Sequence, residues 1–262
     1  MNDKRDAARM LAHQRFSSFP VDLLADMRPG DETEAYALQS AANRQLSKLG
    51  LGPPVGHKIG CTTPVMQAFL DIHSPCAGDI FATGVLQSGQ RIRRADYRRL
   101  GVECEIAVEI SREIDPGDAP FTRETIASAV GAVMAGIEIV DDRYLDYRSL
   151  GVPTLIADNF FNAGCVLGEP VRDWRKLDLE RLEGRTIIDG EEVGRGHGAM
   201  VLGHPLEALA WLANSRAARG LGLAQGKFVF LGSLVETKWL DAGDCVRIEI
   251  EGLGALDLDV SE

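Results

Sequence analysis

Acidic and apolar residues alternate along one long β-type run, 101–110 (GVECEIAVEI), and this pattern limits the possible folds more than any other. Successive side chains of an extended strand point to opposite faces, so Glu103 and Glu105 share one face and the apolar residues between them the other. A second run, 135–140 (AGIEIV), places Glu138 among apolar neighbours, where an isolated carboxylate is expensive to bury. Together the three acids offer what a hard divalent cation needs.

Two interpretations of these glutamates are open. Oxygen ligands without His or Cys suit Mg²⁺ or Mn²⁺ first, and Ca²⁺ as a less favoured alternative, rather than zinc. An acid at every second position is also typical of a strand face in contact with water, and Glu109 continues the alternation. Glu138 favours the metal, because Ile137 and Ile139 leave its carboxylate little water.

Composition excludes some classes of function. The net charge of −11 and the pI near 5.0 argue against a nucleic-acid surface, which needs a basic face. The start of the chain is charged and leads into no apolar signal segment, and no apolar stretch approaches the roughly 20 residues of a membrane span. The 5 cysteines are scattered without CxxC spacing and are typical of reduced thiols, so we expect a cytoplasmic protein.

Strand and helix signals do not alternate regularly, which argues against a doubly wound parallel sheet. We expect an α+β fold: a rolled, mixed β-sheet with N-terminal helices packed outside it, in a single domain, 1–262. Within it, 1–50 forms a helical arm and 51–262 a β-roll core. Expected helices are 4–15, 31–48, 122–134 and 204–220. Asp-Gly inside 186–193 predicts a tight hairpin, and the last forty residues alternate like strands.

One lysine and three histidines are candidates for chemistry. Lys58 lies in VGHKIG (55–60), where we expect the end of a strand. A buried lysine near a metal would lose proton affinity and could act as a base, whereas a lysine on an edge strand would simply be solvated. His57 and His204 are interpreted as structural, and His197 lies in a Gly-rich stretch that a flexible loop explains equally well.

Two polar residues could bind a substrate. Ser233 lacks a nucleophile-elbow motif, so it is a weak nucleophile candidate and could instead offer a hydroxyl or an amide to a bound carboxylate. Asn159 follows Asp158 after an apolar run, in a position typical of a loop or a cap, from which it could face the site.

Several blocks, in the same order, resemble one family. They run from about residue 35 to the C-terminus: GHKIG (56–60) with MQ (66–67), VECEIA (102–107), GIEIVD (136–141), IADN (156–159), LGHPLEALAWLAN (202–214) and AGD (242–244). The chain resembles the 2-keto-4-pentenoate hydratase / 4-oxalocrotonate decarboxylase family, within the fumarylacetoacetate hydrolase superfamily.

The resemblance implies a mixed β-roll core and a divalent metal, Mg²⁺ or Mn²⁺. Glu103, Glu105 and Glu138 fall on the family's three metal carboxylates, and Lys58 falls on its active-site lysine. Members act on short 2-oxo or 2-hydroxydienoic acids from aromatic meta-cleavage catabolism and commonly form homo-oligomers. The chain departs from the family pattern at one position: hydratases usually carry an Asp where Cys76 stands here. A thiol is a poor replacement for a carboxylate near neutral pH.

Three functions follow from the resemblance and the residues. The first is a metal-dependent lyase that hydrates a 2-hydroxydienoate or 2-oxoenoate to a 4-hydroxy-2-oxo acid. The second keeps the metal site but decarboxylates a 4-oxalocrotonate-like diacid or hydrolyses an acylpyruvate. A diacid would need a further cation, for which the candidates are Arg143, Arg148 and Arg195. The third is a non-catalytic member that binds a keto acid, for example within a complex with another pathway enzyme, and the thiol of Cys76 favours this alternative.

Overall fold

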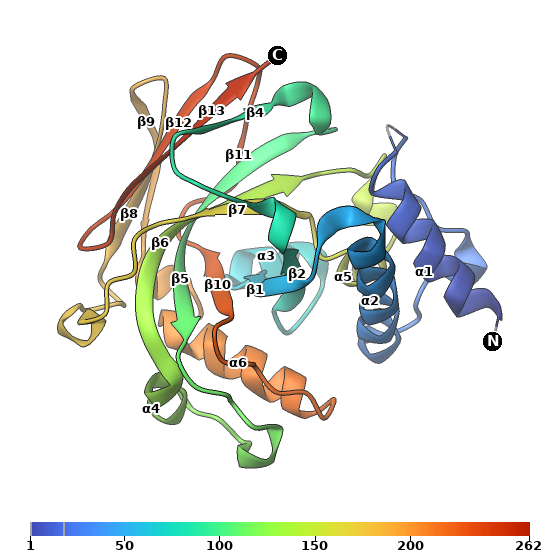
Figure 1. Cartoon of the computed structure of the whole chain (residues 1–262), viewed down its shortest axis with the longest axis horizontal. Helices are drawn as coiled ribbons and strands as arrows, with labels where there is room; N and C mark the ends of the chain where they lie inside the picture. The colour runs from blue at the N-terminus through green and yellow to red at the C-terminus, as the bar shows by residue number, and fades with distance from the viewer. Residues whose placement is uncertain (1, 18) are drawn as a thin grey trace.

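The computed structural model of the chain describes residues 2–17 and 19–262. Figure 1 shows a strongly curved sheet with helices on one side and a second sheet on the other. The α-helices are α1 (Asn2–Gln14), α2 (Glu32–Leu46), α3 (Pro64–Leu70), α4 (Arg123–Ile126), α5 (Val152–Ala157) and α6 (Pro205–Ala217). The strands are β1 (Pro54–Gly60), β2 (Cys76–Phe81), β3 (Val85–Leu86), β4 (Gln90–Arg93), β5 (Leu100–Ile110), β6 (Val130–Asp141), β7 (Asn162–Leu167), β8 (Glu183–Ile188), β9 (Glu191–His197), β10 (Phe228–Ser233), β11 (Lys238–Trp239), β12 (Cys245–Ile250) and β13 (Gly254–Ser261).

The main sheet is mixed and curls on itself. Its strand order is β2-β1-β10-β5-β6-β7-β3, and β11 pairs with β5 beside this path. Two pairs are parallel, β1 with β10 and β3 with β7, and the other pairs are antiparallel. The curl brings β2 into contact with β7, although several strands separate them in the sheet order. The sheet therefore forms a half-closed barrel with an interior of its own.

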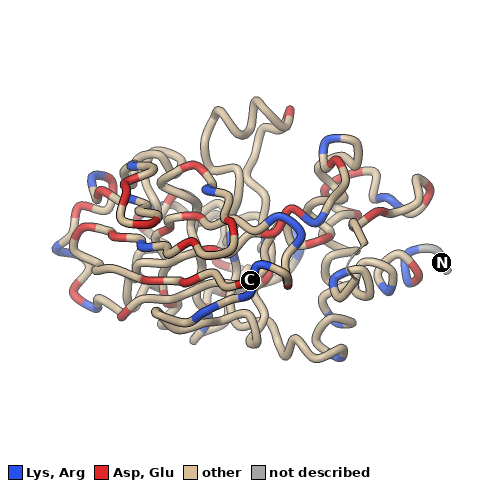
Figure 2. Tube along the Cα trace, turned by 90° about the horizontal axis from the view of Figure 1, so that it is seen from above, with Lys and Arg blue, Asp and Glu red and all other residues tan. Residues whose placement is uncertain are grey.

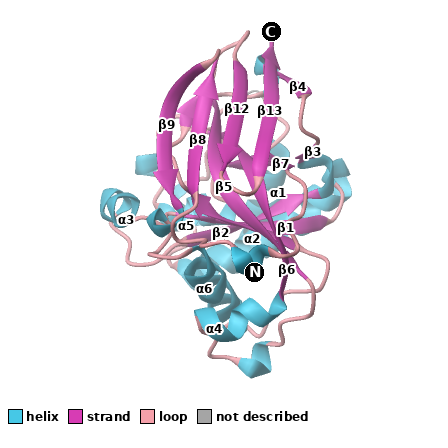
Figure 3. Cartoon of the chain, turned by 90° about the vertical axis from the view of Figure 1, so that its left-hand side faces the viewer, coloured by secondary structure: helices cyan, strands magenta, loops and turns pink. Residues whose placement is uncertain are grey.

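The second sheet has the order β4-β13-β12-β8-β9 and stands beside the barrel, as Figure 3 shows. Its buried residues, such as Ile248 and Leu258, share the main hydrophobic core with Val102 and Ile106 on the outer face of β5. The expected hairpin is confirmed: β8 and β9 are joined through Asp189 and Gly190, both with positive φ, as a tight turn requires.

Helices α1 and α2 pack together outside the barrel, and α2 packs against α5 (Figure 1). Asp31 caps α2 as a helix start requires, because its side chain accepts a hydrogen bond of 2.8 Å from the Glu34 N–H. The α+β class, the rolled mixed sheet and the external N-terminal helices are thus confirmed.

The predicted length of the helix over 122–134 is wrong. Thr122 caps a helix as expected, but α4 ends at Ile126 and gives way to a short 3₁₀ turn. Strand β6 begins at Val130, and its residues pair with β5 along almost its whole length. The β-branched side chains of Val130 and Val133 fit a buried strand better than a helix, and tertiary pairing overrides the weak local helix signal.

Charged side chains are distributed over the whole chain. Figure 2 shows Lys and Arg positions interspersed among the more numerous Asp and Glu positions. Among the residues that the structure describes, no helix is both long and apolar enough to cross a membrane.

Candidate metal centre and active site

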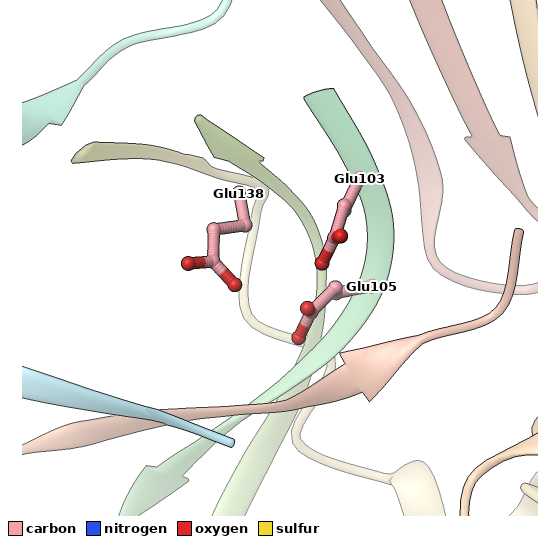
Figure 4. A group of neighbouring side chains, drawn as sticks. All are labelled: Glu103, Glu105 and Glu138. Carbon is pink, nitrogen blue, oxygen red and sulfur yellow. The ribbon is translucent and has the colours of Figure 1, made fainter. Parts of the chain in front are cut away.

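Three glutamates meet inside the half-barrel. Glu103 on β5 lies directly opposite Glu138 on β6, and Glu105 lies opposite Gly136 on the same pair of strands. One carboxylate oxygen from each glutamate lies within 4.8 Å of those of the other two. Figure 4 shows the three side chains pointing toward one another from the two neighbouring strands. The pairing of two long strands is therefore sufficient to assemble the cluster that the sequence predicted.

The glutamates rest on an apolar layer inside the barrel. This layer contains Ile80, Ala107, Met134, Cys165 and Phe230, from five different strands. Gly136 separates it from the carboxylates and is required there, because a Cβ at this position would lie 2.4 Å from the Phe230 ring. With hydrocarbon beneath them, the carboxylates occupy an environment of low dielectric, which strengthens every charge interaction in the site.

Two of the carboxylates have one oxygen held by the protein and one left without a partner. The N–H of Gly232 donates to Glu105 Oε2 at 2.8 Å, and Asn162 Nδ2 donates to Glu138 Oε1 at 3.0 Å. Glu105 Oε1 and Glu138 Oε2 are buried and have no hydrogen-bond partner. Because a buried unpaired carboxylate oxygen is costly, these two atoms are suited to binding a cation.

The third carboxylate is held in a similar way. Glu103 is half-buried, and the hydroxyl of Thr237, just before β11, donates to its Oε1. All three glutamates are therefore oriented by a donor from a neighbouring strand or loop, as metal ligands commonly are. An all-carboxylate set suits Mg²⁺ or Mn²⁺, so the residues fit the divalent metal that the sequence predicted.

Lys58 on β1 completes the cluster. Its Nζ lies 3.1 Å from Glu138 Oε1, and the side chain is almost fully buried. Burial alone would lower the pKa of Lys58, but the attraction of Glu138, Glu103 and Glu105 outweighs burial, so the pKa is raised. When ionised, the three carboxylates carry three negative charges, and the Lys58 ammonium compensates one of them. One divalent cation would compensate the remaining two.

The glutamates themselves are poorly accommodated as free anions. Burial, followed by repulsion from Glu138 and Glu103, raises the pKa of Glu105 well above its ordinary value. Burial and Glu138 also raise the pKa of Glu103, although Lys58 opposes them. The ionised carboxylates therefore repel one another in a buried site, and a bound cation would offset this repulsion.

Cys76 lies on the face of β2 that is directed toward Lys58. Gly78 pairs with Lys58, and Cys76, two residues earlier, pairs with Gly60, so the thiol side of Cys76 shares the Lys58 face. A hydrogen bond with Cys61, together with burial, raises the pKa of the Cys76 thiol well above its ordinary value. At this position the chain therefore presents a neutral thiol.

Asp79 faces the opposite side of β2 and does not replace the missing carboxylate. It pairs across the strands with His57, and His57 Nδ1 lies 2.7 Å from Asp79 Oδ1. The structural interpretation of His57 therefore holds. It also holds for His204, whose Nδ1 accepts from the Leu206 N–H at the start of α6, and His197 is exposed on β9.

The two expected substrate-binding residues occupy different places. Ser233 is half-exposed opposite Glu105, and its hydroxyl contacts the carbonyl oxygens of Cys104 and Val235. Asn159 is buried, and its amide is bonded to Asn43 and to the backbone N–H of Asp79 rather than to the glutamates.

None of the three arginines proposed for a second carboxylate contacts the glutamates. Arg143 is buried and paired with Asp158 at 2.6 Å. Arg148 lies over the Phe69 ring of α3, 4.6 Å from its centroid. Arg195 forms surface ion pairs with Glu183 and Glu192.

The sequence did not single out the side-chain and backbone donors Thr237, Asn162 and Gly232, nor Phe160, whose ring centroid lies 5.2 Å from Lys58 Nζ. Asn162 had the clearest signal, as a polar residue at the start of an apolar run (NAGCVL). The other donors depend on which strands become neighbours, which local patterns do not specify.

Comparison with known proteins identifies the family of the chain. Residues 81–261 match the family model described as fumarylacetoacetate (FAA) hydrolase C-terminal. A 2-keto-4-pentenoate hydratase from Burkholderia vietnamiensis is 33% identical over 266 residues, covering 100% of both chains. A 4-oxalocrotonate decarboxylase from a Pseudomonas species is 31% identical, covering 79% of this chain and 78% of the relative.

The fold is also shared with solved structures. The 4-oxalocrotonate decarboxylase from Pseudomonas putida G7, complexed with magnesium and adipate, aligns with a TM-score of 0.92 and 23% identity, over 99% of this chain and 97% of that one. Family model, full-length relatives and fold agree: the chain belongs to the fumarylacetoacetate hydrolase family, together with the 2-keto-4-pentenoate hydratases and 4-oxalocrotonate decarboxylases.

Proposed function

We propose that the chain is a divalent-metal-dependent lyase that hydrates a short 2-hydroxydienoate, such as 2-hydroxypenta-2,4-dienoate, to a 4-hydroxy-2-oxo acid. The observation that carries this proposal is the pair of buried, unpartnered oxygens on Glu105 and Glu138, beside a buried Lys58. Full-length relatives that are 2-keto-4-pentenoate hydratases support the reaction.

In this proposal Glu103, Glu105 and Glu138 hold Mg²⁺ or Mn²⁺. The bound cation would supply Lewis acidity that stabilises negative charge on the 2-oxygen of the substrate. The barrel's apolar layer excludes water from beneath the carboxylates, and Gly232 and Asn162 fix two of them in place.

Lys58 would move the proton. It would transfer the proton of the substrate's 2-hydroxyl to C5, which converts the dienol to the conjugated 2-oxo-3-enoate without net change in composition. Water then adds across the enone, with its oxygen at C4 and a proton at C3. In the metal-free site, attraction by the glutamates raises the pKa of Lys58 above its ordinary value. In the proposed reaction, an ammonium that donates a proton to C5 and then accepts the proton of the 2-hydroxyl returns to its starting form.

Ser233 is half-exposed beside Glu105, and we place it next to the carboxylate end of the substrate. Asn159 is not included, because its amide is fully engaged with Asn43 and Asp79.

The alternative reaction is decarboxylation of a 4-oxalocrotonate-like diacid on the same site. Relatives with that activity support it, whereas the engagement of Arg143, Arg148 and Arg195 elsewhere speaks against a second substrate carboxylate. Hydrolysis of an acylpyruvate would need an additional base near the site.

The deciding experiment follows the ultraviolet absorbance of 2-hydroxypenta-2,4-dienoate with purified protein, first with Mg²⁺ or Mn²⁺ and then with EDTA. Metal-dependent loss of the dienol with 4-hydroxy-2-oxopentanoate as product is expected. Loss of CO₂ from 4-oxalocrotonate without hydration of the dienoate would establish the alternative. No turnover of either substrate by protein that binds metal would indicate a non-catalytic member, and Cys76→Asp would then be expected to create hydratase activity if the thiol is the cause.

We also propose a cytoplasmic homo-oligomer. Its 5 free cysteines support a reducing compartment. Large apolar side chains such as Phe19, Val65 and Leu145 are more than three-quarters exposed and would be covered by neighbouring copies. Sedimentation velocity of the purified protein tests the assembly, and a monomer would contradict it.

A further inference from the structure

An unusual backbone segment connects α5 to β7 beside the site. Asn159, Phe160 and Phe161 are consecutive and have φ values of 59°, 48° and 67°. The left-handed region is unfavourable for residues that carry a Cβ, and three such residues in succession persist only where the surrounding structure holds them. We call residues 159–161 the left-handed turn.

Helix α2 holds one end of this turn. Asn159 Nδ2 donates to Asn43 Oδ1 at 2.6 Å, and Asn43 Nδ2 donates back to Asn159 Oδ1 at 3.1 Å. Asn43 Nδ2 also donates to Asp79 Oδ2 at 2.9 Å, and the Asp79 N–H donates to Asn159 Oδ1 at 2.9 Å. Both asparagines are buried, so their amides fix the turn against α2 and β2 together.

The left-handed turn contacts Lys58 and leads directly into the residue that contacts Glu138. The Phe160 ring centroid lies 5.2 Å from Lys58 Nζ, and a Cβ on Gly60 would lie 3.0 Å from that ring, so the ring packs directly on β1. Immediately after the turn, Asn162 donates to Glu138 Oε1 at 3.0 Å. The turn thus spans the gap between β1 and β6 inside the barrel.

We propose that Asn43 is a positioning residue of the active site: acting through the left-handed turn, it fixes Lys58 and Glu138 relative to each other. The N-terminal helical arm is then part of the catalytic architecture rather than a cover for the sheet. The inference rests on the proposed function in so far as Lys58 and Glu138 are the residues that move the proton and hold the cation.

Helix α2 supplies a matched control in Gln39, one turn before Asn43. Gln39 is equally buried, and its Nε2 donates to the carbonyl oxygens of Ala77 at 2.8 Å and Ile156 at 2.7 Å. It therefore joins α2 to β2 and α5 but makes no hydrogen bond to the turn. A purely structural role of α2 predicts the same consequences for Asn43→Ala and Gln39→Ala.

The test compares wild type, Asn43→Ala, Gln39→Ala and Asn159→Gly. Glycine adopts a φ of this sign without strain, so Asn159→Gly removes the amide and spares the backbone, and it remains informative if Asn43→Ala does not fold. Mn²⁺ affinity is measured by calorimetry, stability by thermal unfolding in EDTA, and kcat and KM on 2-hydroxypenta-2,4-dienoate.

We expect Asn43→Ala and Gln39→Ala to lose similar stability. Mn²⁺ affinity should fall about 10-fold or more in Asn43→Ala and Asn159→Gly alone, as for other groups that orient metal ligands, and kcat should fall more than KM rises. Equal losses of Mn²⁺ affinity in Gln39→Ala, or unchanged affinity in Asn159→Gly, would overturn the proposal.

Failure of the proposed function is distinguishable. If wild type binds Mn²⁺ without converting the dienoate, the proposed reaction is wrong, and the affinities of the variants still decide the role of Asn43. If wild type binds no Mn²⁺, both proposals fail.

Discussion

Two strands of this molecule carry the same alternating acids and use them differently. Glu103 and Glu105 on β5 point into the half-barrel, where Glu105 is fully buried. Asp257 and Asp259 on β13 point outward from the second sheet, and each faces an arginine: Arg247 Nη1 lies 2.9 Å from Asp257, and an arginine of β4 lies 3.4 Å from Asp259.

The difference lies in what surrounds the acids and not in their spacing. On β13, water and long arginine side chains compensate the carboxylates, and such exposed pairs contribute little to stability. On β5, apolar side chains lie beneath the carboxylates, and one buried oxygen of Glu105 has no partner. Alternating acids therefore indicate a site only where the fold buries them without sufficient positive charge.

Removal of a buried carboxylate on β5 should have the strongest effect on metal binding. Glu105→Gln removes a ligand charge and should weaken Mn²⁺ binding more than ~100-fold, beyond the range seen for residues that merely orient ligands. Asp257→Asn is the matched control on β13 and should bind Mn²⁺ as wild type does. Calorimetric titration measures both. Unchanged affinity in Glu105→Gln would show that the metal site has been placed wrongly.

A smaller effect is expected at the residue that orients Glu103. Thr237→Val keeps the shape of the side chain but removes the hydroxyl that donates to Glu103 Oε1. We expect Mn²⁺ affinity to fall about 10-fold, with little change in the unfolding temperature. Thr237→Ser retains the hydroxyl and should restore most of the affinity; an equally weak serine variant would assign the loss to packing.

The pH dependence of stability should have opposite signs in the two regions. Burial first, and then Glu138 and Glu103, raise the pKa of Glu105, so the folded state holds this proton more tightly than the unfolded state does. In EDTA, this carboxyl therefore costs stability as pH rises above its ordinary pKa, and Glu105→Gln should gain stability relative to wild type as pH rises above about 5.

On the second sheet, hydrogen bonds from Arg247 and then Arg185 lower the pKa of Glu249. Its favourable contribution is present above the ordinary pKa and is lost as pH falls through the lowered value, so Glu249→Gln should lose a little stability relative to wild type at neutral pH. Thermal unfolding across this pH range compares the two variants. A shift of the same sign in both would contradict the assigned environments.

Loss of a surface arginine on the second sheet should have very little effect. Arg247→Ala removes the exposed partner of Asp257 and Glu249, yet solvent and salt already screen these contacts. We expect no resolvable change in Mn²⁺ affinity and at most a marginal decrease in the unfolding temperature. A large decrease would mean that the surface ion pairs of the second sheet stabilise the fold as a network.

Much of the site was predictable because it depends on local patterns. Alternation placed Glu103 and Glu105 on one face, and the apolar neighbours of Glu138 marked it as buried. The donors Thr237 and Gly232 were not predictable, since β10 and β11 reach β5 from more than a hundred residues away in sequence. The division into an arm, 1–50, and a core, 51–262, stays a prediction.

Local patterns also misled where tertiary contacts decide. The helix signal after Thr122 continued past Ile126, but pairing with β5 converted the following residues to strand. Asn159 was expected near the substrate because it follows an apolar run, yet an asparagine on α2, far away in sequence, engages its amide. Single residues at the ends of elements take their roles from distant partners, which a single sequence does not display.

The order in which the strands of the barrel meet has a consequence for folding. Strands β5 and β6 follow each other along the chain, so their antiparallel pairing can gather the three glutamates early. Lys58 arrives only when β1 pairs in parallel with β10, which closes a very long loop, and such non-local parallel pairing is slow. Until then the carboxylates repel one another without a counter-charge. We therefore expect a divalent cation to act as a folding cofactor that accelerates renaturation.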